Sequence, residues 1–250
     1  MIEPILEYAR KNGLDVESGF KPKDVRWAIA CNSQGHFLEE VIELGDTENK
    51  RNKGRTFAKC PDLSQSELIA TNGPGCHFLV ETAGVVALLS DGNTDERKAQ
   101  KKHESFVNLL QLASTTWPSL LPVVSCLSDE ETLRKIQARL SEIGAKPADK
   151  VTVRIDERFP LDSNEWHQWW RDYRKAFRDS EAKPADDLSK TRCFATGDLV
   201  KPTRTHPKIE GLSDVGGQST GDVLVGFDKD SFQSYGFKKS ENAAFSEESA

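Results

Sequence analysis

The segment 211–221 carries the most unusual local chemistry in the sequence. Four glycines fall within these eleven positions, and Gln218 lies between Gly217 and Ser219. Glycine lets a backbone adopt positive φ and approach a partner closely, and a glutamine amide offers two donors and one acceptor. Such a loop suits a nucleic-acid groove, with Gly216, Gly217, Gln218 and Ser219 as the contact residues. A turn that serves only the fold is the alternative, and composition alone favours it.

Two basic segments offer charges for phosphate. The first spans residues 50–59 and has five cations and no acid: Lys50, Arg51, Lys53, Arg55 and Lys59. The second precedes the glycine-rich segment and includes Arg204, His206 and Lys208. A run of charge is more often a solvated loop than a binding site, and we expect a loop over 50–59. Because phosphate contacts from Lys and Arg supply most of the affinity for nucleic acid, both segments are candidate DNA-binding sites.

Motifs for catalysis, metals and nucleotides are missing from the sequence. The five cysteines and five histidines lack the short pairwise spacings of zinc sites. Residues 73–78 lack the third glycine of a dinucleotide-binding turn, and Gly217 stands where a phosphate-binding loop needs lysine. No Gly-x-Ser-x-Gly elbow marks a nucleophile. We therefore expect no enzyme activity, no catalytic residue, no metal and no cofactor.

An aromatic stripe in the segment 166–177 has two interpretations. Its members are Trp166, Trp169, Trp170, Tyr173 and Phe177. These rings could stack on unpaired bases, since four basic residues lie close by: Arg171, Arg174, Lys175 and Arg178. Their spacing defines a single helical face, however, and this favours a packed core with the basic residues on its solvated rim.

Periodicity and turn residues predict the elements that position these groups. We expect a hairpin from strands 25–31 and 37–44, helices over 94–113 and 128–144, a strand over 151–155 and a helix from Asp162. The spacing of Ser128 and Glu131 indicates a capping box, and Asp162 and Glu165 form a second. The apolar segment 78–89 is expected to be a buried helix or strand, which periodicity cannot separate over that length, and we prefer the helix. The segments 193–196 and 223–227 are expected to be β-like. The predicted fold is α+β: a mixed helical and antiparallel-strand domain over 1–180, then a β/loop-rich part over 181–250.

Composition limits the class of protein. The chain has 250 residues, a formal net charge of −6 and a mean hydropathy of −0.59. No apolar run approaches the roughly 18 residues of a membrane span, and the cysteine pattern indicates no disulfide framework. We therefore expect a cytoplasmic protein with no membrane partner. The acidic average discourages nucleic-acid binding, but the basic segments depart from that average.

The last third of the chain resembles a known family. The ordered match consists of His206–Ile209, Gly216–Gly221, Leu224-Val225, Phe227, Phe232, Ser234-Tyr235-Gly236, Asn242-Ala243 and Ser246. This pattern resembles the type I-C CRISPR Cascade large subunit. A weaker likeness covers Pro22-Lys23, Val25, Trp27, Gly35–Leu38, Gly73 and Phe78-Leu79. One departure is the segment 73–79, which lacks the basic residue expected there.

The resemblance implies a non-catalytic subunit of a crRNA-guided antiviral surveillance complex. Such a subunit would recognise the protospacer-adjacent motif and promote opening of the target DNA duplex. Its partners would be target double-stranded DNA, crRNA, the backbone and small subunits of the complex, and a recruited helicase-nuclease. The family chain is longer, so we expect this sequence to be its N-terminal portion. A structural subunit that binds protein partners and the crRNA end without reading DNA is the alternative.

Overall fold

The computed structural model describes most of the chain. The described residues are Pro4, Glu7, Tyr8, Lys11, and residues 17–49, 52–68, 73–92, 95–181, 190–200, 202, 206, 208–209, 215–218, 221–223, 226 and 242–246. The chain divides into two compact units, residues 19–181 and residues 1–18 together with 182–250. Helices and strands are both present, so the predicted α+β class is confirmed. The expected domains 1–180 and 181–250 stay a prediction.

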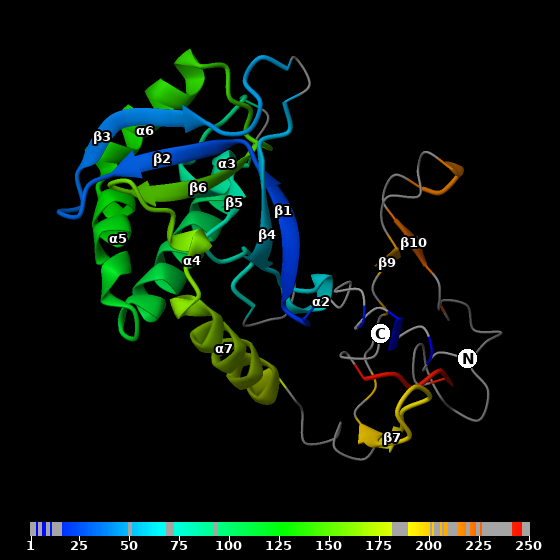
Figure 1. Cartoon of the computed structure of the whole chain (residues 1–250). Helices are drawn as coiled ribbons and strands as arrows, with labels where there is room; N and C mark the ends of the chain where they lie inside the picture. The colour runs from blue at the N-terminus through cyan, green and yellow to red at the C-terminus, as the bar shows by residue number, and fades with distance from the viewer. Residues whose placement is uncertain are drawn as a thin grey trace. The chain divides into compact units, whose positions relative to one another are not determined.

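A four-stranded sheet forms the centre of the unit 19–181 (Figure 1). Its strands lie in the order β3 (Phe37–Glu43), β2 (Trp27–Cys31), β6 (Lys150–Ile155) and β5 (Glu81–Thr82). The hairpin of β2 and β3 and the strand β6 confirm the sequence predictions. The parallel pairing of β2 with β6 is new, since the sequence indicated antiparallel strands alone. All five residues of β2 are buried, as expected for a strand covered on both faces.

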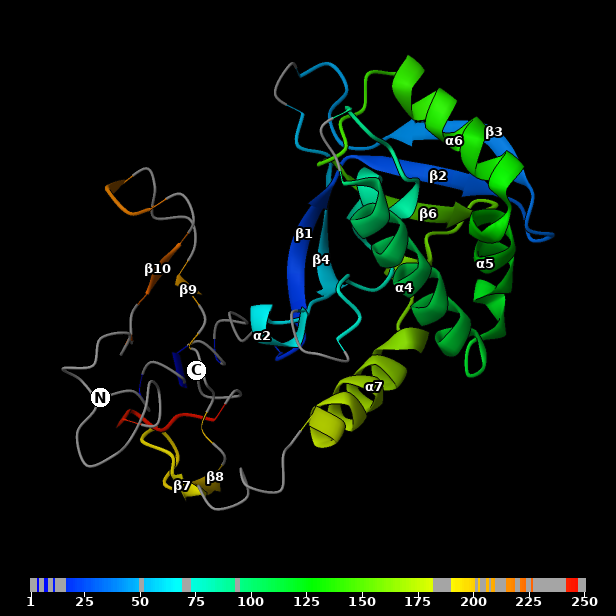
Figure 2. The same ribbon diagram turned by 180° about the vertical axis from the view of Figure 1, so that it is seen from behind.

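Helices cover one face of this sheet (Figure 2). They are α3 (Ala83–Val86), α4 (Glu96–Ser114), α5 (Leu121–Ser128) and α6 (Glu130–Glu142). The helices predicted over 94–113 and 128–144 are confirmed by α4 and α6, but the capping box at Ser128 is wrong. Ser128 ends α5 and donates to the Val124 carbonyl at 2.7 Å, whereas the Asp129 carboxylate accepts the Thr132 N–H at 2.8 Å and caps α6.

Two other local predictions within this unit are corrected. The preferred continuous helix over 78–89 is wrong: the segment contains both alternatives in short form, the strand β5 and the single turn α3, all four residues of which are buried. Asp162 does not cap a helix, because it ends the 3-10 turn η2 (Pro160–Asp162) and its carboxylate accepts from Arg55. The Ser163 hydroxyl instead accepts the Glu165 N–H at 3.2 Å, at the start of α7 (Glu165–Glu181).

A two-stranded antiparallel ribbon, β1 (Phe20–Val25) with β4 (Arg55–Pro61), replaces part of the loop expected over 50–59. Phe57 and Cys60 are buried while Arg55 and Thr56 are exposed. The charge of the exposed residues is the reason why the sequence predicted a loop here instead of a strand. Gly54 makes the entry into β4 possible. Its φ is +98°, and a Cβ there would lie 2.1 Å from the Val25 carbonyl oxygen.

Helix α7 (Glu165–Glu181) packs its aromatic stripe inward, as the spacing predicted. Trp166 and Trp170 are fully buried, and the Trp170 ring stacks on Phe78 with centroids 5.8 Å apart. The Trp170 indole also donates to the Gly19 carbonyl at 2.7 Å. The prediction that all four basic residues lie on a solvated rim is wrong for Arg174, which is buried.

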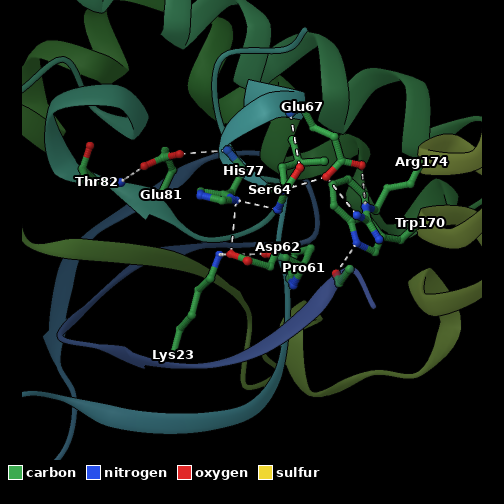
Figure 3. Close-up of polar contacts among 12 residues, drawn as sticks. Lys23, Pro61, Asp62, Ser64, Glu67, His77, Glu81, Thr82, Trp170 and Arg174 are labelled. Atoms are coloured by element: carbon green, nitrogen blue, oxygen red, sulfur yellow. Dashed lines mark hydrogen bonds and ion pairs between the residues drawn. The ribbon is translucent and has the colours of Figure 1, made fainter. Parts of the chain in front are cut away.

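Arg174 is buried because it pairs with Glu67 (Figure 3). Its guanidinium donates to both Glu67 carboxylate oxygens, at 3.1 and 2.8 Å, and the two side chains are 5% and 7% exposed. Glu67 lies in the short helix α2 (Gln65–Leu68), which follows β4, and it also accepts the Ser64 N–H at 2.7 Å. Burial alone would raise the pKa of Glu67, but the charge and hydrogen bonds of Arg174, together with the hydrogen bonds from Ser64, lower that pKa. This ion pair joins α7 to the end of β4.

The other unit contains short strands. β7 (Thr191–Arg192) pairs with β8 (Leu199–Val200), and β9 (Lys208–Ile209) pairs with β10 (Asp222–Val223), both antiparallel. The expected strand 193–196 is wrong, because Gly197 donates to the Cys193 carbonyl and these residues form the turn between β7 and β8. Val223 belongs to β10, while 224–225 and 227 lie outside the described residues. None of the helices in the described part of the chain has the length and apolar character needed to cross a membrane.

We predict that Glu67→Ala destabilises the unit 19–181 by about 3 to 5 kcal/mol, since it leaves the buried Arg174 charge without its partner. All five tryptophans lie within this unit, so tryptophan fluorescence during urea unfolding reports on it alone.

Glu130→Ala is the matched control, because the Glu130 side chain is 87% exposed in its ion pair with Arg134. The control should unfold close to the wild type, since exposed pairs contribute little. Equal midpoints for Glu67→Ala and Glu130→Ala would contradict the role given to the buried pair.

Candidate nucleic-acid interface

The basic segment 50–59 contributes cations from β4 and the loop before it. Lys53 is exposed in that loop, Arg55 begins β4 and Lys59 lies toward its other end. Lys50 and Arg51 lie outside the described residues. The strand therefore distributes these charges along the β1–β4 ribbon, as an extended backbone requires.

Arg55 has strong competing contacts within the protein. Its guanidinium reaches both carboxylate oxygens of Asp162 at 2.9 Å, and its Cζ lies 4.3 Å from the centroid of the Phe57 ring. The negative charge of Asp162 offsets the positive charge of Arg55, which would otherwise attract a phosphate. A DNA contact by Arg55 stays a prediction. Among the described contacts, fewer compete with a phosphate for Lys53 than for Arg55.

Lys59 lies over an aromatic ring that α7 also covers. The Lys59 Nζ is 4.3 Å from the centroid of Phe20, and the Arg171 guanidinium is 5.4 Å from the same centroid. Phe20 itself is buried, with 5% of its surface exposed. Two cations from different elements thus lie at one ring, an arrangement that cation–π attraction stabilises.

The glycine-rich segment joins β9 to β10. Lys208 pairs with Val223 and Ile209 with Asp222, so the chain between them, residues 210–221, closes a two-stranded ribbon. Lys208 is exposed on β9. Arg204 and Ser219 lie outside the described residues.

The described part of this loop presents its side chains outward from a fixed backbone. Val215 is 81% exposed and Gln218 is exposed. The Gln218 N–H donates to the Asp222 carboxylate at 3.1 Å, and the Gln218 carbonyl accepts the Gly221 N–H at 3.0 Å. Gly216 has a φ of +100°, which a residue with a side chain rarely adopts. The backbone of Gln218 is therefore held in a turn while the residue is exposed.

Asp222 is the residue that sequence reasoning missed at this loop. It lies four positions after Gln218 and supplies the carboxylate that fixes the turn. No local sequence signal identifies it, because an Asp in an Asx-turn accepts from the N–H two residues further on, whereas the N–H of Gln218 lies four residues earlier.

His206 is held within its own unit. Its ring meets Phe245 edge-on with centroids 5.3 Å apart, and it hydrogen-bonds to the Ala243 backbone. Burial lowers the pKa of His206, although the Ala243 carbonyl opposes this shift. Its Nε2 is buried and has no hydrogen-bond partner among the described residues. A neutral, packed imidazole offers less to a phosphate than the sequence suggested.

A cluster of titratable groups lies between β1 and the segment 77–82 (Figure 3). The Lys23 ammonium is 2.8 Å from Asp62 and also donates to the Pro61 carbonyl at 2.8 Å. The His77 Nδ1 accepts the Leu63 N–H at 3.2 Å and lies 3.6 Å from Asp62. Burial lowers the pKa of Lys23, against the opposing charge of Asp62. The contacts of Lys23 therefore join β1 to the end of β4 and the residue that follows it.

No group of three or more His, Cys, Asp or Glu side chains is placed to hold a metal ion within the described ranges. Cys31, Cys60, Cys76, Cys126 and Cys193 are all buried as free thiols. Burial raises the pKa of Cys60 to about 11 and that of Cys76 to about 12, which keeps both protonated.

In the unit 19–181, cations lie on the β1–β4 ribbon and on α7. In the other unit, the loop between β9 and β10 is rich in glycine and exposes side chains. A family model described as "CRISPR-associated protein (Cas_Csd1)" matches residues 7–250. The chain belongs to this CRISPR-associated Cascade family, and the family resemblance seen in the sequence is confirmed. Its role therefore lies in CRISPR surveillance. No match was found among curated proteins.

We predict that His77 makes the stability of the unit 19–181 depend on pH. Burial lowers the pKa of His77 below the ordinary 6.5, and the charge of Lys23 adds to this, against Glu81 and Asp62. The unfolded chain therefore takes up the proton first, so the free energy of unfolding falls as pH drops through about 6.5. His77→Asn keeps an acceptor for the Leu63 N–H and removes the titration.

Urea unfolding at pH 7.5 and 5.5, followed by tryptophan fluorescence, measures the difference. The wild type should lose more stability between these pH values than His77→Asn does. The same loss in both proteins would contradict the assignment.

Proposed function

We propose that this chain is a non-catalytic large subunit of a type I-C surveillance complex, which recognises the protospacer-adjacent motif and aids opening of the target duplex. One observation carries the proposal: the loop that joins β9 and β10 exposes Val215 and Gln218 on a backbone that Asp222 fixes. The membership of the chain in a Cascade family supports the same assignment.

The chemistry of the loop fits contact with base pairs. A glutamine amide can bond both edge groups of an adenine in the major groove, and an exposed apolar side chain such as Val215 can enter between base steps in the minor groove. Gly217 carries no side chain next to Gln218, so the backbone can approach the duplex closely. A turn that is fixed before binding lowers the entropy cost of recognition.

Cations of each unit would add contacts to phosphates of the target DNA. Lys53 and Lys59 on the β1–β4 ribbon and Lys208 on β9 provide sequence-independent phosphate contacts. Specificity beyond the short motif would come from pairing with the guide RNA, as in other RNA-guided systems. The proposal therefore includes target DNA, crRNA, the backbone and small subunits, and a recruited helicase-nuclease as partners.

The alternative is a structural subunit that binds protein partners and the crRNA end without reading DNA. Two observations favour it at particular residues: Asp162 offsets the Arg55 charge, and burial lowers the pKa of His206. Neither observation concerns the loop at Gln218, where the two functions predict different results.

We predict that Gln218→Ala weakens binding of the assembled complex to motif-containing duplex by about 5- to 150-fold. This range corresponds to the roughly 1 to 3 kcal/mol that one bidentate base contact contributes. Binding to a duplex without the motif should stay unchanged. Titration of both duplexes at one salt concentration measures the ratio of the two affinities.

Gln100→Ala is the control, since Gln100 is an exposed glutamine of α4 that bonds Glu104. The control should leave both affinities unchanged. An equal loss on both duplexes, or no loss on either, would refute motif reading by Gln218, and no loss on either would support the structural alternative.

A further inference from the structure

The helix α4 gathers its cations on one side. At 3.6 residues per turn, all lysines and arginines of this helix fall within an arc of about 140° around its axis: Arg97, Lys98, Lys101 and Lys102. The first three are exposed, and Lys102 is half-buried at the edge of the arc. We call these four residues the α4 basic face. The positions that continue the arc toward the end of the helix are uncharged: Ser105, Asn108 and Leu112.

The acids at the start of α4 lie outside this arc: Asp95, Glu96 and Glu104. The Asp95 carboxylate caps the helix and accepts the Lys98 N–H at 3.2 Å. Glu104 accepts from Gln100 at 3.1 Å, although Lys101 lies three residues before it. The negative charges are therefore offset around the helix from the α4 basic face.

The α4 basic face makes no ion pair among the residues that the structure describes. Lys102 lies near the Cys76 thiol, which is protonated and carries no charge. The positions of the unit 19–181 outside the described residues contain no acid: 50–51, 69–72 and 93–94. Other cations of this unit differ, since Arg55, for example, pairs with Asp162.

These cations oppose the stability of their own helix. Arg97 and Lys98 lie in the first turn of α4, where the helix dipole is positive and favours acids. Lys101 follows Arg97 by four residues and Lys102 follows Lys98 by four, so both pairs place like charges next to each other. A bound polyanion would offset both kinds of repulsion.

We infer that the α4 basic face binds the phosphate backbone of double-stranded DNA without regard to sequence. Arg97 and Lys101 lie about 6 Å apart along the helix, at roughly 1.5 Å per residue. Cations this close suit a DNA strand, which carries one phosphate for roughly every 3.4 Å of duplex. The inference rests on the proposed function, to which it adds the α4 basic face as a DNA contact.

The surface around α4 favours a duplex over a single strand. Proteins that bind single strands combine cations with exposed aromatic rings on which bases stack. The large apolar side chains exposed in the described part of the unit 19–181 are all leucines: Leu38, Leu112 and Leu121. The α4 basic face therefore offers contacts for phosphates without rings for unpaired bases.

The test is the salt dependence of duplex binding by the assembled complex that carries Arg97→Gln and Lys101→Gln together. Each lost phosphate contact should make the slope of log K against log[salt] less negative by about 0.9, so the double variant should change it by about 1.8. The affinity lost at about 50 mM salt should thus shrink about tenfold by about 200 mM salt. The loss should be the same on duplexes with and without the motif.

Urea unfolding of the same variant, followed by tryptophan fluorescence, separates binding from folding. Its midpoint should equal or exceed that of the wild type, because the changes remove repulsion at the start of α4. If the double variant does not fold, Lys101→Gln alone should change the slope by about 0.9.

Arg134→Gln with Lys135→Gln in α6 is the matched control. It removes one arginine and one lysine from an exposed helix of the same unit, where Glu130 and Glu131 already pair with them. Its salt slope should equal that of the wild type.

Three results would overturn the inference: equal slopes for the α4 and α6 variants, a loss confined to motif-containing duplex, or a loss of crRNA from the complex with duplex binding unchanged. The last result would assign the face to RNA. The test is separable from that of Gln218, because the α4 variants should alter the salt slope and leave the ratio of motif to non-motif affinity unchanged.

Discussion

The buried ion pair between Glu67 and Arg174 is the contact on which the position of α7 depends. It joins two segments 107 residues apart in sequence, with a bidentate geometry and almost no exposure to water. Removing two charges from water is costly, and good geometry repays this cost only when both partners are present. The pair therefore contributes more to fixing α7 beside the β1–β4 ribbon than to net stability. The cations of β4 and α7 meet at Phe20 because the helix is held there.

The same constraint explains how an acidic chain can present a basic surface. The whole chain carries −6, and its acids are spread over many elements. On α7 the aromatic stripe occupies the core side and leaves Arg171 and Lys175 exposed. Charge pattern within one element, rather than the charge of the whole chain, thus decides what the surface can bind.

Local signals in the sequence predicted α4, α6, β6 and the β2–β3 hairpin, because apolar spacing and turn residues act over a few positions. The strand β4 was mistaken for a loop, since its outward cations concealed the buried Phe57 and Cys60. The parallel pairing of β2 with β6 depends on residues more than 100 positions apart and has no local signal. Arg174 was expected on the rim for the same reason, because Glu67 is distant in sequence. At the candidate site, Gly216 and Gln218 were identified from residue type alone, while the anchoring by Asp222 required the geometry.

A structure of the assembled complex bound to motif-containing duplex would test the central claim most directly. The account predicts that the Gln218 amide lies within hydrogen-bond distance of a base edge at the motif, or that the loop enters between base pairs beside it. A loop that instead contacts only a protein subunit or the crRNA would contradict the account.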